Sequence, residues 1–275
     1  MGKRFLNILE QGKTLSTFTM DAISPELELT DAELHLYSRQ ILLEGWDIEA
    51  QERLKLSNVC IVGCGGIGCV LAELLARAGV GKITLIDPDT IEMSNLQRQL
   101  AFTPEDLGFY KAEILAKRLR QINPHVRVES INQALTTENA TALIQHQDLV
   151  LDGCDQFATR YLVNQSCVKL NVPLLSASAI GFQGQLFMLE GDSACYACLF
   201  PPENQADESL RCADSGVLAT TPNVMASLQA HHALLYLGLG KMPLRQNFLL
   251  WDGLNFKQRI LSFQKDTDCP VCQAR

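Results

Sequence analysis

The sequence predicts an α/β fold, in which a doubly wound, mostly parallel sheet carries added antiparallel strands. Strand and helix signals alternate from about residue 58 to residue 178. Such alternation gives a parallel sheet with helices on both faces. A glycine-rich turn follows the first apolar run, and two Cys-x-x-Cys pairs lie in the last third of the chain. These three observations also place the two regions that could carry chemistry.

The first part of the chain supplies the parallel strands. Residues 59–62 and 83–87 are short apolar runs with a predicted helix, 67–78, between them. Residues 111–122 are apolar at helical spacing and end before Asn123-Pro124, where a helix would stop. Strands at 126–131, 148–152 and 173–177 and a helix at 157–170 complete the alternation. Ligands of such sheets bind at the carboxyl ends of the strands.

After residue 180 the pattern changes. Residues 184–189, 248–251 and 256–263 have strand signals that suit an added sheet with antiparallel character, and a helix is predicted near 223–237. Residues 201–216 are rich in charge and turn formers, which indicates an exposed loop.

Composition excludes several classes of protein. With 275 residues, 47% of them apolar, the chain can bury one substantial core. No apolar stretch is long enough to span a bilayer, and the basic start is broken by Asn7, Glu10 and Lys13, so it makes a poor signal peptide. A net charge of −8 argues against a nucleic-acid partner. Ten cysteines without a secretory signal indicate a reducing, cytoplasmic location.

The glycine-rich turn reads Gly63-Cys64-Gly65-Gly66-Ile67-Gly68 and predicts a Rossmann-like nucleotide site. Glycines let the backbone approach a phosphate, and the helix that they open presents free N–H groups to it. Asp87, at the end of the next strand, is placed to bind ribose hydroxyls. Beyond it, Asn95, Arg98, Gln99 and Lys111 add polar and cationic groups, which suit stabilising charge on a phosphate under attack. The chain is therefore predicted to use ATP.

Four cysteines form two knuckles, Cys195-Tyr-Ala-Cys198 and Cys269-Pro-Val-Cys272. Two such turns can complete a closed, structural Cys₄ zinc site that staples the C-terminal region to the body. A redox pair and four incidental cysteines are the alternatives. Cys212 lies beside Arg211 in the predicted loop and is either a thiol nucleophile or a loop residue without a role.

Together these residues resemble the MoeB/ThiF/HesA family, the ubiquitin-activating-like enzymes that adenylate small sulfur-carrier proteins. The resemblance runs from about residue 29 to residue 272. It is carried by the glycine turn, both knuckles and the following segments: Tyr37-Ser38-Arg39-Gln40, Leu85-Ile86-Asp87, Ser94-Asn95-Leu96-Gln97-Arg98-Gln99, Lys111, and the run from Asp152 to Asp155.

The resemblance implies roles for individual residues. Arg98, Lys111 and Asp155 would be catalytic, with Asp155 holding Mg²⁺. Arg39 would reach the active site of the other subunit of a homodimer, and Cys212 could form a covalent link to the carrier or to a sulfur donor protein. The implied ATP-binding residues are Gly63, Gly65, Gly66, Asp87, Ser94, Asn95, Leu96, Gln97, Arg98, Gln99, Lys111, Asp155 and Gln156.

The family also implies the reaction and the division of the chain. The C-terminal Gly-Gly carboxylate of a ubiquitin-like carrier, MoaD-like or ThiS-like, would be adenylated for thiocarboxylate formation. The pathway would be molybdopterin biosynthesis, thiamine biosynthesis or both, with ATP, Mg²⁺ and Zn²⁺ as cofactors. Residues 1–27 would be a flexible leader and 28–275 one adenylyltransferase domain. Its nucleotide-binding part would span about 58–180, and its carrier-binding and zinc part about 181–275.

Some positions leave alternatives open. The family usually has Asp-Cys-Thr-Asp-Asn where this chain has Asp152-Gly153-Cys154-Asp155-Gln156, so a contact at Gln156 is in doubt. Arg160 is expected to be a surface charge on its helix rather than a nucleotide contact. Residues 175–186 look more like the thiamine-pathway enzyme and residues 45–49 more like the molybdopterin one. The rival functions are an NAD-dependent oxidoreductase, which leaves Arg98 and Lys111 unexplained, and a non-catalytic scaffold.

Overall fold

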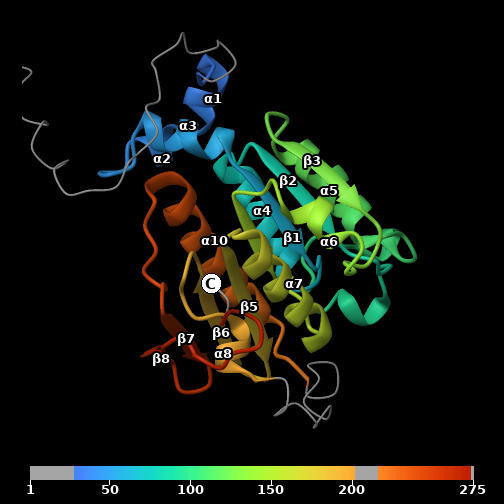
Figure 1. Ribbon diagram of the computed structural model, residues 1–275. Coiled ribbons are helices and arrows are strands. Elements are labelled where there is room, and N and C mark those ends of the chain that lie inside the picture. Colours follow the sequence, from blue (N-terminus) through green and yellow to red (C-terminus); the bar gives the residue numbers. More distant parts are fainter. Residues whose placement is uncertain (1–27, 202–215, 274–275) are drawn as a thin grey trace, which may run out of the picture.

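A single eight-stranded sheet forms the centre of the computed structural model, which describes residues 28–201 and 216–273 (Figure 1). The strand order is β3-β2-β1-β4-β5-β6-β7-β8. The strands are β1 (Asn58–Val62), β2 (Lys82–Ile86), β3 (Arg127–Ile131), β4 (Leu149–Asp152), β5 (Leu174–Ile180), β6 (Gln183–Leu189), β7 (Asn247–Asp252) and β8 (Lys257–Ser262).

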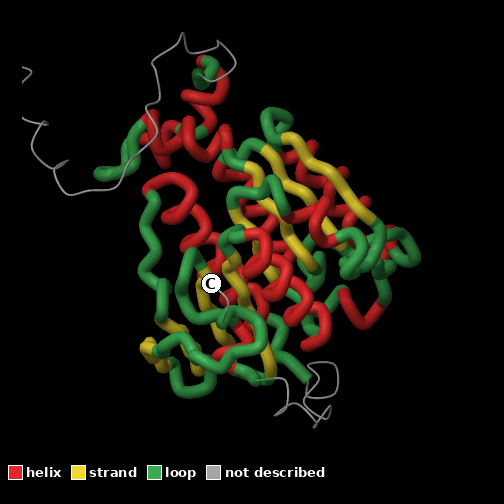
Figure 2. Tube along the Cα trace, viewed as in Figure 1, coloured by secondary structure: helices red, strands yellow, loops and turns green. Residues whose placement is uncertain are grey.

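Helices cover both faces of this sheet (Figure 2). Side chains along β1 alternate between two cores: Val59 and Ile61 face one, and Cys60 and Val62 face the other. Helices α3 (Ile48–Leu56), α4 (Gly68–Ala78), α5 (Lys111–Ile122) and α10 (Thr220–Leu239) pack on the first core. Helices α6 (Ala140–Ile144), α7 (Phe157–Leu170) and α8 (Tyr196–Leu199) pack on the second.

The five strands from β3 to β5 are all parallel, as the alternating pattern predicted. Helices α5 and α7 begin and end at the predicted residues. The short helices α1 (Asp31–Leu36), α2 (Ser38–Ile41), α6 and α8 were not predicted. Helices this short are marginal by themselves and depend on tertiary packing, so a local pattern does not indicate them.

The predicted added antiparallel strands are confirmed, but they continue the same sheet and do not form an added sheet of their own. A turn at Gly181 and Phe182 brings β6 back antiparallel to β5, and β7 and β8 follow antiparallel in turn. Gly181 has a φ of +55°, which glycine adopts readily. Leu186 of β6 and Leu249 of β7 thereby join the first core, which also covers the parallel strands. The parallel and antiparallel parts of the sheet therefore pack into the same core.

A short 3₁₀ turn, Pro104–Asp106, is held by its own last residue. Asp106 accepts hydrogen bonds from the Thr103 N–H at 2.8 Å and the Thr103 hydroxyl at 2.9 Å. It also pairs with Arg118 on α5. Partial burial acts to raise the pKa of Asp106, but these contacts lower it below its usual value. The carboxylate therefore fastens the loop before α5.

The predicted leader, residues 1–27, lies outside the described residues, as does most of the predicted loop at 201–216. Among the described helices none has the length and hydropathy needed to cross a membrane.

Candidate functional site

The glycine turn joins β1 to α4 by a path that only glycine permits at two positions. Gly63 has a φ of +92°, and a Cβ there would lie 3.1 Å from the carbonyl carbon of Gly153. A Cβ on Gly68 would lie 1.8 Å from the Gly63 carbonyl oxygen, far inside van der Waals contact. The absence of these side chains lets α4 begin directly against the strand, with its N-terminus at the carboxyl ends of the strands. A helix N-terminus in this position favours an anion.

A pocket opens at this end of the sheet, over the ends of β1, β2 and β4. Gln99 is buried there, and its Oε1 atom accepts no hydrogen bond within the described part of the chain. An acceptor is therefore left for a donor group of a ligand. The pocket brings together these predicted site residues: Gly63, Gly65, Gly66, Asp87, Arg98, Gln99, Lys111 and Asp155.

Asp87 is held in place by the backbone. It accepts hydrogen bonds from the N–H of Cys64 at 2.6 Å and from the N–H of Asp89 at 2.8 Å. Burial raises the pKa of Asp87, while the Lys111 ammonium and the two N–H groups act in the opposite direction. The carboxylate is thus fixed at the rim of the glycine turn, where a ribose hydroxyl could donate to it.

Lys111 is the first residue of α5 and is almost fully buried. Its Nζ lies 2.8 Å from Oδ2 of Asp89, whose side chain is 63% exposed. Arg98 donates from Nη1 to the Ser94 carbonyl at 3.0 Å. Two cations therefore converge on the mouth of the glycine turn, and the partner of Lys111 is an exposed carboxylate that water can solvate. This arrangement could neutralise charge that develops on a phosphate.

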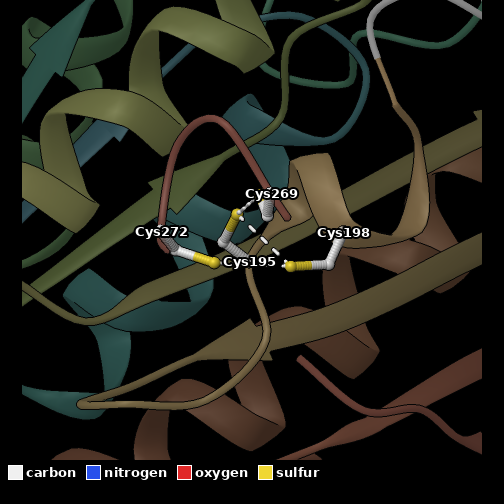
Figure 3. Close-up of side chains that lie close together, drawn as sticks. All are labelled: Cys195, Cys198, Cys269 and Cys272. Atoms are coloured by element: carbon white, nitrogen blue, oxygen red, sulfur yellow. Dashed lines mark hydrogen bonds between the residues drawn. The ribbon is translucent and has the colours of Figure 1, made fainter. Parts of the chain in front are cut away.

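The four predicted zinc ligands form a second site, on the face of the sheet that the second core covers. Figure 3 shows the sulfurs of Cys195, Cys198, Cys269 and Cys272 gathered from two turns far apart in the sequence. Their Sγ atoms all lie within 4.8 Å of one another. Three of the sulfur–sulfur distances are 3.9 Å (Cys195–Cys198), 3.7 Å (Cys195–Cys269) and 3.4 Å (Cys198–Cys272).

These separations fit a metal rather than disulfides. Sulfurs bound 2.3 Å from a tetrahedral zinc ion stand about 3.8 Å apart, whereas a disulfide needs about 2.05 Å. All nine described cysteines are free. Burial raises the pKa of Cys195 to about 11. Burial also acts to raise the pKa of Cys269, but hydrogen bonds from the N–H groups of Cys272 and Val271 lower it. Burial and the hydrogen bond with Cys198 raise the pKa of Cys272 in the same knuckle, so binding of a metal would release protons from these thiols.

Comparison with known proteins decides the family. The model of the ThiF family matches residues 37–271. The chain belongs to the ThiF family. It is 40% identical to the sulfur carrier protein ThiS adenylyltransferase of Escherichia coli over 246 residues, which are 89% of this chain and 97% of that one. It is also 40% identical to the molybdopterin-synthase adenylyltransferase of E. coli over 248 residues, 89% of this chain and 98% of that one.

A solved structure agrees with this assignment. The crystal structure of E. coli MccB with ATP matches with a TM-score of 0.72 and 26% identity, over 82% of this chain and 70% of that chain. The comparisons confirm the predicted family and the predicted enzyme class, an adenylyltransferase of the ThiF type. The α/β fold with its clustered cysteines is confirmed as well.

In the described part of this ThiF-family chain, several residues predicted to bind ATP do not line the pocket. Asn95 accepts from the Glu92 N–H at 3.2 Å. Gln97 donates to the Val217 carbonyl at 3.4 Å. These contacts shape the turn from which Arg98 and Gln99 enter the pocket. The predicted residues outside the pocket lining are Ser94, Asn95, Leu96, Gln97, Gln156 and Arg39, and their roles stay predictions.

Arg39 lies near the C-terminal end of α4, whereas the pocket lies at its N-terminal end. It is an exposed residue on α2, where its neighbour Gln40 donates to the carbonyl of Ala78, the last residue of α4. The pocket lies at the other end of α4, which has 11 residues and is about 16 Å long. Arg39 therefore does not reach the pocket of its own chain. Cys212 lies outside the described residues.

The expectation that Arg160 is a surface charge is wrong. Its side chain is 7% exposed and lines the pocket. Its Nη1 lies 3.4 Å from Oδ2 of Asp152 and donates to the Ser176 hydroxyl at 3.2 Å, and its Nη2 donates to the Cys154 carbonyl. The Ser176 hydroxyl donates to Asp152 at 2.6 Å. Arg160 is buried because Asp152, at the end of β4, supplies the opposite charge.

Sequence reasoning also missed how α10 closes the pocket. Val217 and Pro222, before and within the first turn of α10, line the pocket, and Pro222 lies against Gly66. The Thr221 hydroxyl donates to the Gly181 carbonyl at 3.1 Å, which ties α10 to the β5–β6 turn. The helix itself was predicted, but no local signal indicates which element its first turn contacts.

Proposed function

We propose that the chain is an ATP-dependent adenylyltransferase that activates the C-terminal Gly-Gly carboxylate of a ubiquitin-like sulfur carrier. The observation that carries this proposal is the convergence of Arg98 and Lys111 on the glycine turn, beside the buried Asp87. A hydride-transferring enzyme has no need of two cations at the phosphates. The names of the two E. coli relatives, each about as long as this chain, support the same activity.

The reaction follows from the geometry of the pocket. The N–H groups of the glycine turn hold the phosphates, and Asp87 accepts hydrogen bonds from the ribose hydroxyls. An oxygen of the carrier's carboxylate attacks the α-phosphorus, the bond from that phosphorus to the bridging oxygen breaks, and pyrophosphate leaves with the electron pair. Arg98 and Lys111 stabilise the charge on the phosphoryl oxygens, so catalysis consists mainly of positioning and electrostatics. The product is an acyl-adenylate.

Mg²⁺ would be held by Asp155, an exposed carboxylate in the pocket lining. A single carboxylate together with substrate phosphates is a usual way to bind Mg²⁺. The ion would neutralise phosphate charge when bound. The Arg160 contact with the Cys154 carbonyl fixes the residue just before Asp155 and so supports this carboxylate.

We propose that both a MoaD-like and a ThiS-like carrier are substrates, for molybdopterin and thiamine biosynthesis. The identity to the two E. coli enzymes is the same, 40% in each case. The segment with thiamine-type sequence, 175–186, covers most of β5 and the turn into β6, and its Ala179 lines the pocket. The segment with molybdopterin-type sequence, 45–49, lies at the start of α3, whose Gln51 donates to the carbonyl of Ala78 at the end of α4 away from the pocket.

A cytoplasmic homodimer with shared active sites is the proposed working form. Arg39 is too far from the pocket of its own chain, so its predicted role requires a second copy. Leu42 and Leu43, close to Arg39 in the sequence, are 78% and 61% exposed. Exposed leucines of this kind suit a surface that is covered in an assembly. Cys212 is proposed as the site of a covalent link to the carrier or to a sulfur donor protein.

Zinc is proposed at the four-cysteine cluster, in a structural role. Four thiolates close the coordination shell and leave no position for water or substrate. The cluster ties the turn after β8 to α8 on the second core. Metal binding would therefore contribute to folding rather than to the adenylation chemistry.

The test is pyrophosphate exchange into ATP, measured with each carrier and with carriers that lack the terminal Gly-Gly. We expect exchange that requires Mg²⁺, the intact carrier and ATP. In parallel, ATP and not NAD should raise the midpoint of thermal unfolding. Exchange that is absent with both carriers would reject the proposed substrates, and protection by NAD alone would favour the oxidoreductase instead.

A further inference from the structure

Helix α7 connects the nucleotide pocket to the four-cysteine cluster. Arg160 and Asn164 are four residues apart, so they lie one turn apart on the same face of the helix. Both are buried. Arg160 lines the nucleotide pocket, whereas the side chain of Asn164 contacts the residues of the first cysteine knuckle. One rigid element therefore carries a residue of each site.

The orientation of the Asn164 amide is set by its neighbours. Its Oδ1 accepts a hydrogen bond from the backbone N–H of Tyr196 at 2.9 Å. Only oxygen can accept this bond, so the Nδ2 donor is the other end of the amide. Nδ2 is fully buried and donates no hydrogen bond to any acceptor among the described residues. It lies beside Cys195, whose pKa it acts to lower, and is available to donate to the sulfur of a metal-bound thiolate. An N–H donor of this kind stabilises a metal-bound thiolate.

Two further contacts fasten the knuckle to the same helix. The Tyr161 hydroxyl donates to the Phe200 carbonyl, just after α8. The rings of Tyr161 and Tyr196 pack edge to face with centroids 5.4 Å apart. Helix α8, which begins directly after Cys195 and contains Cys198, is thus held against α7. The position of α7 and the geometry of the cluster constrain each other.

At the other end, Arg160 transmits the position of α7 to the pocket. Its guanidinium contacts Asp152 at the end of β4 and the carbonyl of Cys154. Cys154 immediately precedes Asp155, whose carboxylate faces the pocket. A shift of α7 by a fraction of an ångström would therefore move both a pocket cation and the Asp155 loop.

We propose that Asn164 is a positioning residue that couples metal binding at the four-cysteine cluster to nucleotide binding, through α7 and Arg160. Zinc and ATP then strengthen each other's binding, since coupling between two sites is reciprocal. The proposal rests on the ATP site of the proposed function. Under this proposal the metal at the four-cysteine cluster affects the nucleotide pocket without contacting the substrate or the reacting atoms.

The test uses Asn164→Asp, which keeps an oxygen for the Tyr196 N–H and replaces the buried Nδ2 donor beside Cys195 by a second oxygen. Zinc affinity is measured by competition with a chelator, and ATP affinity by calorimetry on the zinc-loaded protein. Loss of a hydrogen bond to a ligand typically costs about 10- to 100-fold in metal affinity. We expect that loss, together with ATP binding weakened by about 5-fold, in the range of typical coupling. The thiolate-to-metal charge-transfer band of the cobalt-substituted protein should shift.

Two variants separate this effect from simple destabilisation. Gln165→Glu makes the same amide-to-acid change at the next residue, which is exposed, and should leave both affinities unchanged. Val163→Ala removes fully buried apolar volume from the same helix. It should lower the unfolding midpoint and leave the cobalt spectrum as in the wild type. Equal losses of zinc affinity in Val163→Ala and Asn164→Asp would overturn the proposal.

A measurement on the wild-type protein does not depend on any variant folding. Saturating ATP should tighten zinc binding by the factor by which zinc tightens ATP binding. If ATP binds but zinc affinity does not change, the coupling is wrong and the proposed function stands. If the wild-type protein binds no ATP at all, the proposed function fails and this inference fails with it.

Discussion

Replacing Lys111 by methionine should separate catalysis from stability. The lysine is almost fully buried, and its ion-pair partner Asp89 has a side chain that is 63% exposed. A pair with one exposed member contributes at most about 1 kcal/mol to folding. Methionine keeps the unbranched chain and forms helices about as well as lysine. The buried Asp87 carboxylate loses a nearby cation but keeps its two backbone N–H donors. The free energy of unfolding should therefore change by less than about 1 kcal/mol.

The effect on the reaction should be much larger. The ammonium lies in the pocket beside the glycine turn, where the proposed phosphate charge develops. Removing one such positioned donor costs roughly 3–4 kcal/mol, or about 10²- to 10³-fold in rate. The assay is carrier-dependent pyrophosphate exchange, with thermal unfolding measured on the same samples. Lys117→Met, on the exposed face of the same helix, is the matched control and should keep full activity. Exchange at the wild-type rate in a folded Lys111→Met protein would refute the phosphate role of Lys111.

Three other predictions follow from the same structure. Metal analysis should find about one zinc per chain. Cys269→Ser should lose the zinc and expose the C-terminal turn to proteolysis. A Cys212→Ser protein without zinc would contradict the assignment of Cys195, Cys198, Cys269 and Cys272 as the ligands. Mixing inactive Arg39→Ala and Lys111→Ala proteins should restore part of the exchange activity through shared sites, and no recovery after verified subunit exchange would count against them. Asp106→Asn should cost about 1 kcal/mol of stability at neutral pH. Because contacts lower the pKa of Asp106 in the folded state, that cost should vanish as the pH falls through the lowered value, as pH-dependent denaturation would measure.

Much of the parallel half could be predicted from local patterns. The apolar runs of β1 and β2 are buried on both faces, which is why they are continuous rather than alternating. The spacing in α5 marks its buried stripe, and Asn123-Pro124 marks its end. The chemistry of the glycine turn is also local, since Gly68 contacts the carbonyl of Gly63 only five residues away.

Site features that depend on residues close together in the sequence were the easiest to predict. Each cysteine knuckle is a four-residue turn, and so its two sulfurs could be assigned together from spacing alone. The meeting of the two knuckles was inferred from ligand chemistry and is confirmed by the cluster. By contrast, the role of Asn95 inside its own turn could not be distinguished from a ligand contact, because both need the same amide side chain.

What the sequence by itself determined, then, is the order and type of the main elements, the glycine turn, and the residues able to bind phosphate or metal. Only the tertiary structure decided that the late strands continue the same sheet, that the first turn of α10 closes the pocket, and that Arg160 is buried. The physical reason is the range of the contacts. Arg160 is neutralised by Asp152 and donates to the Ser176 hydroxyl. Gln229 on α10 donates to the carbonyl of Asp152, 77 positions before it. Pairings of this kind depend on how whole elements pack, which no periodicity within a single element can specify.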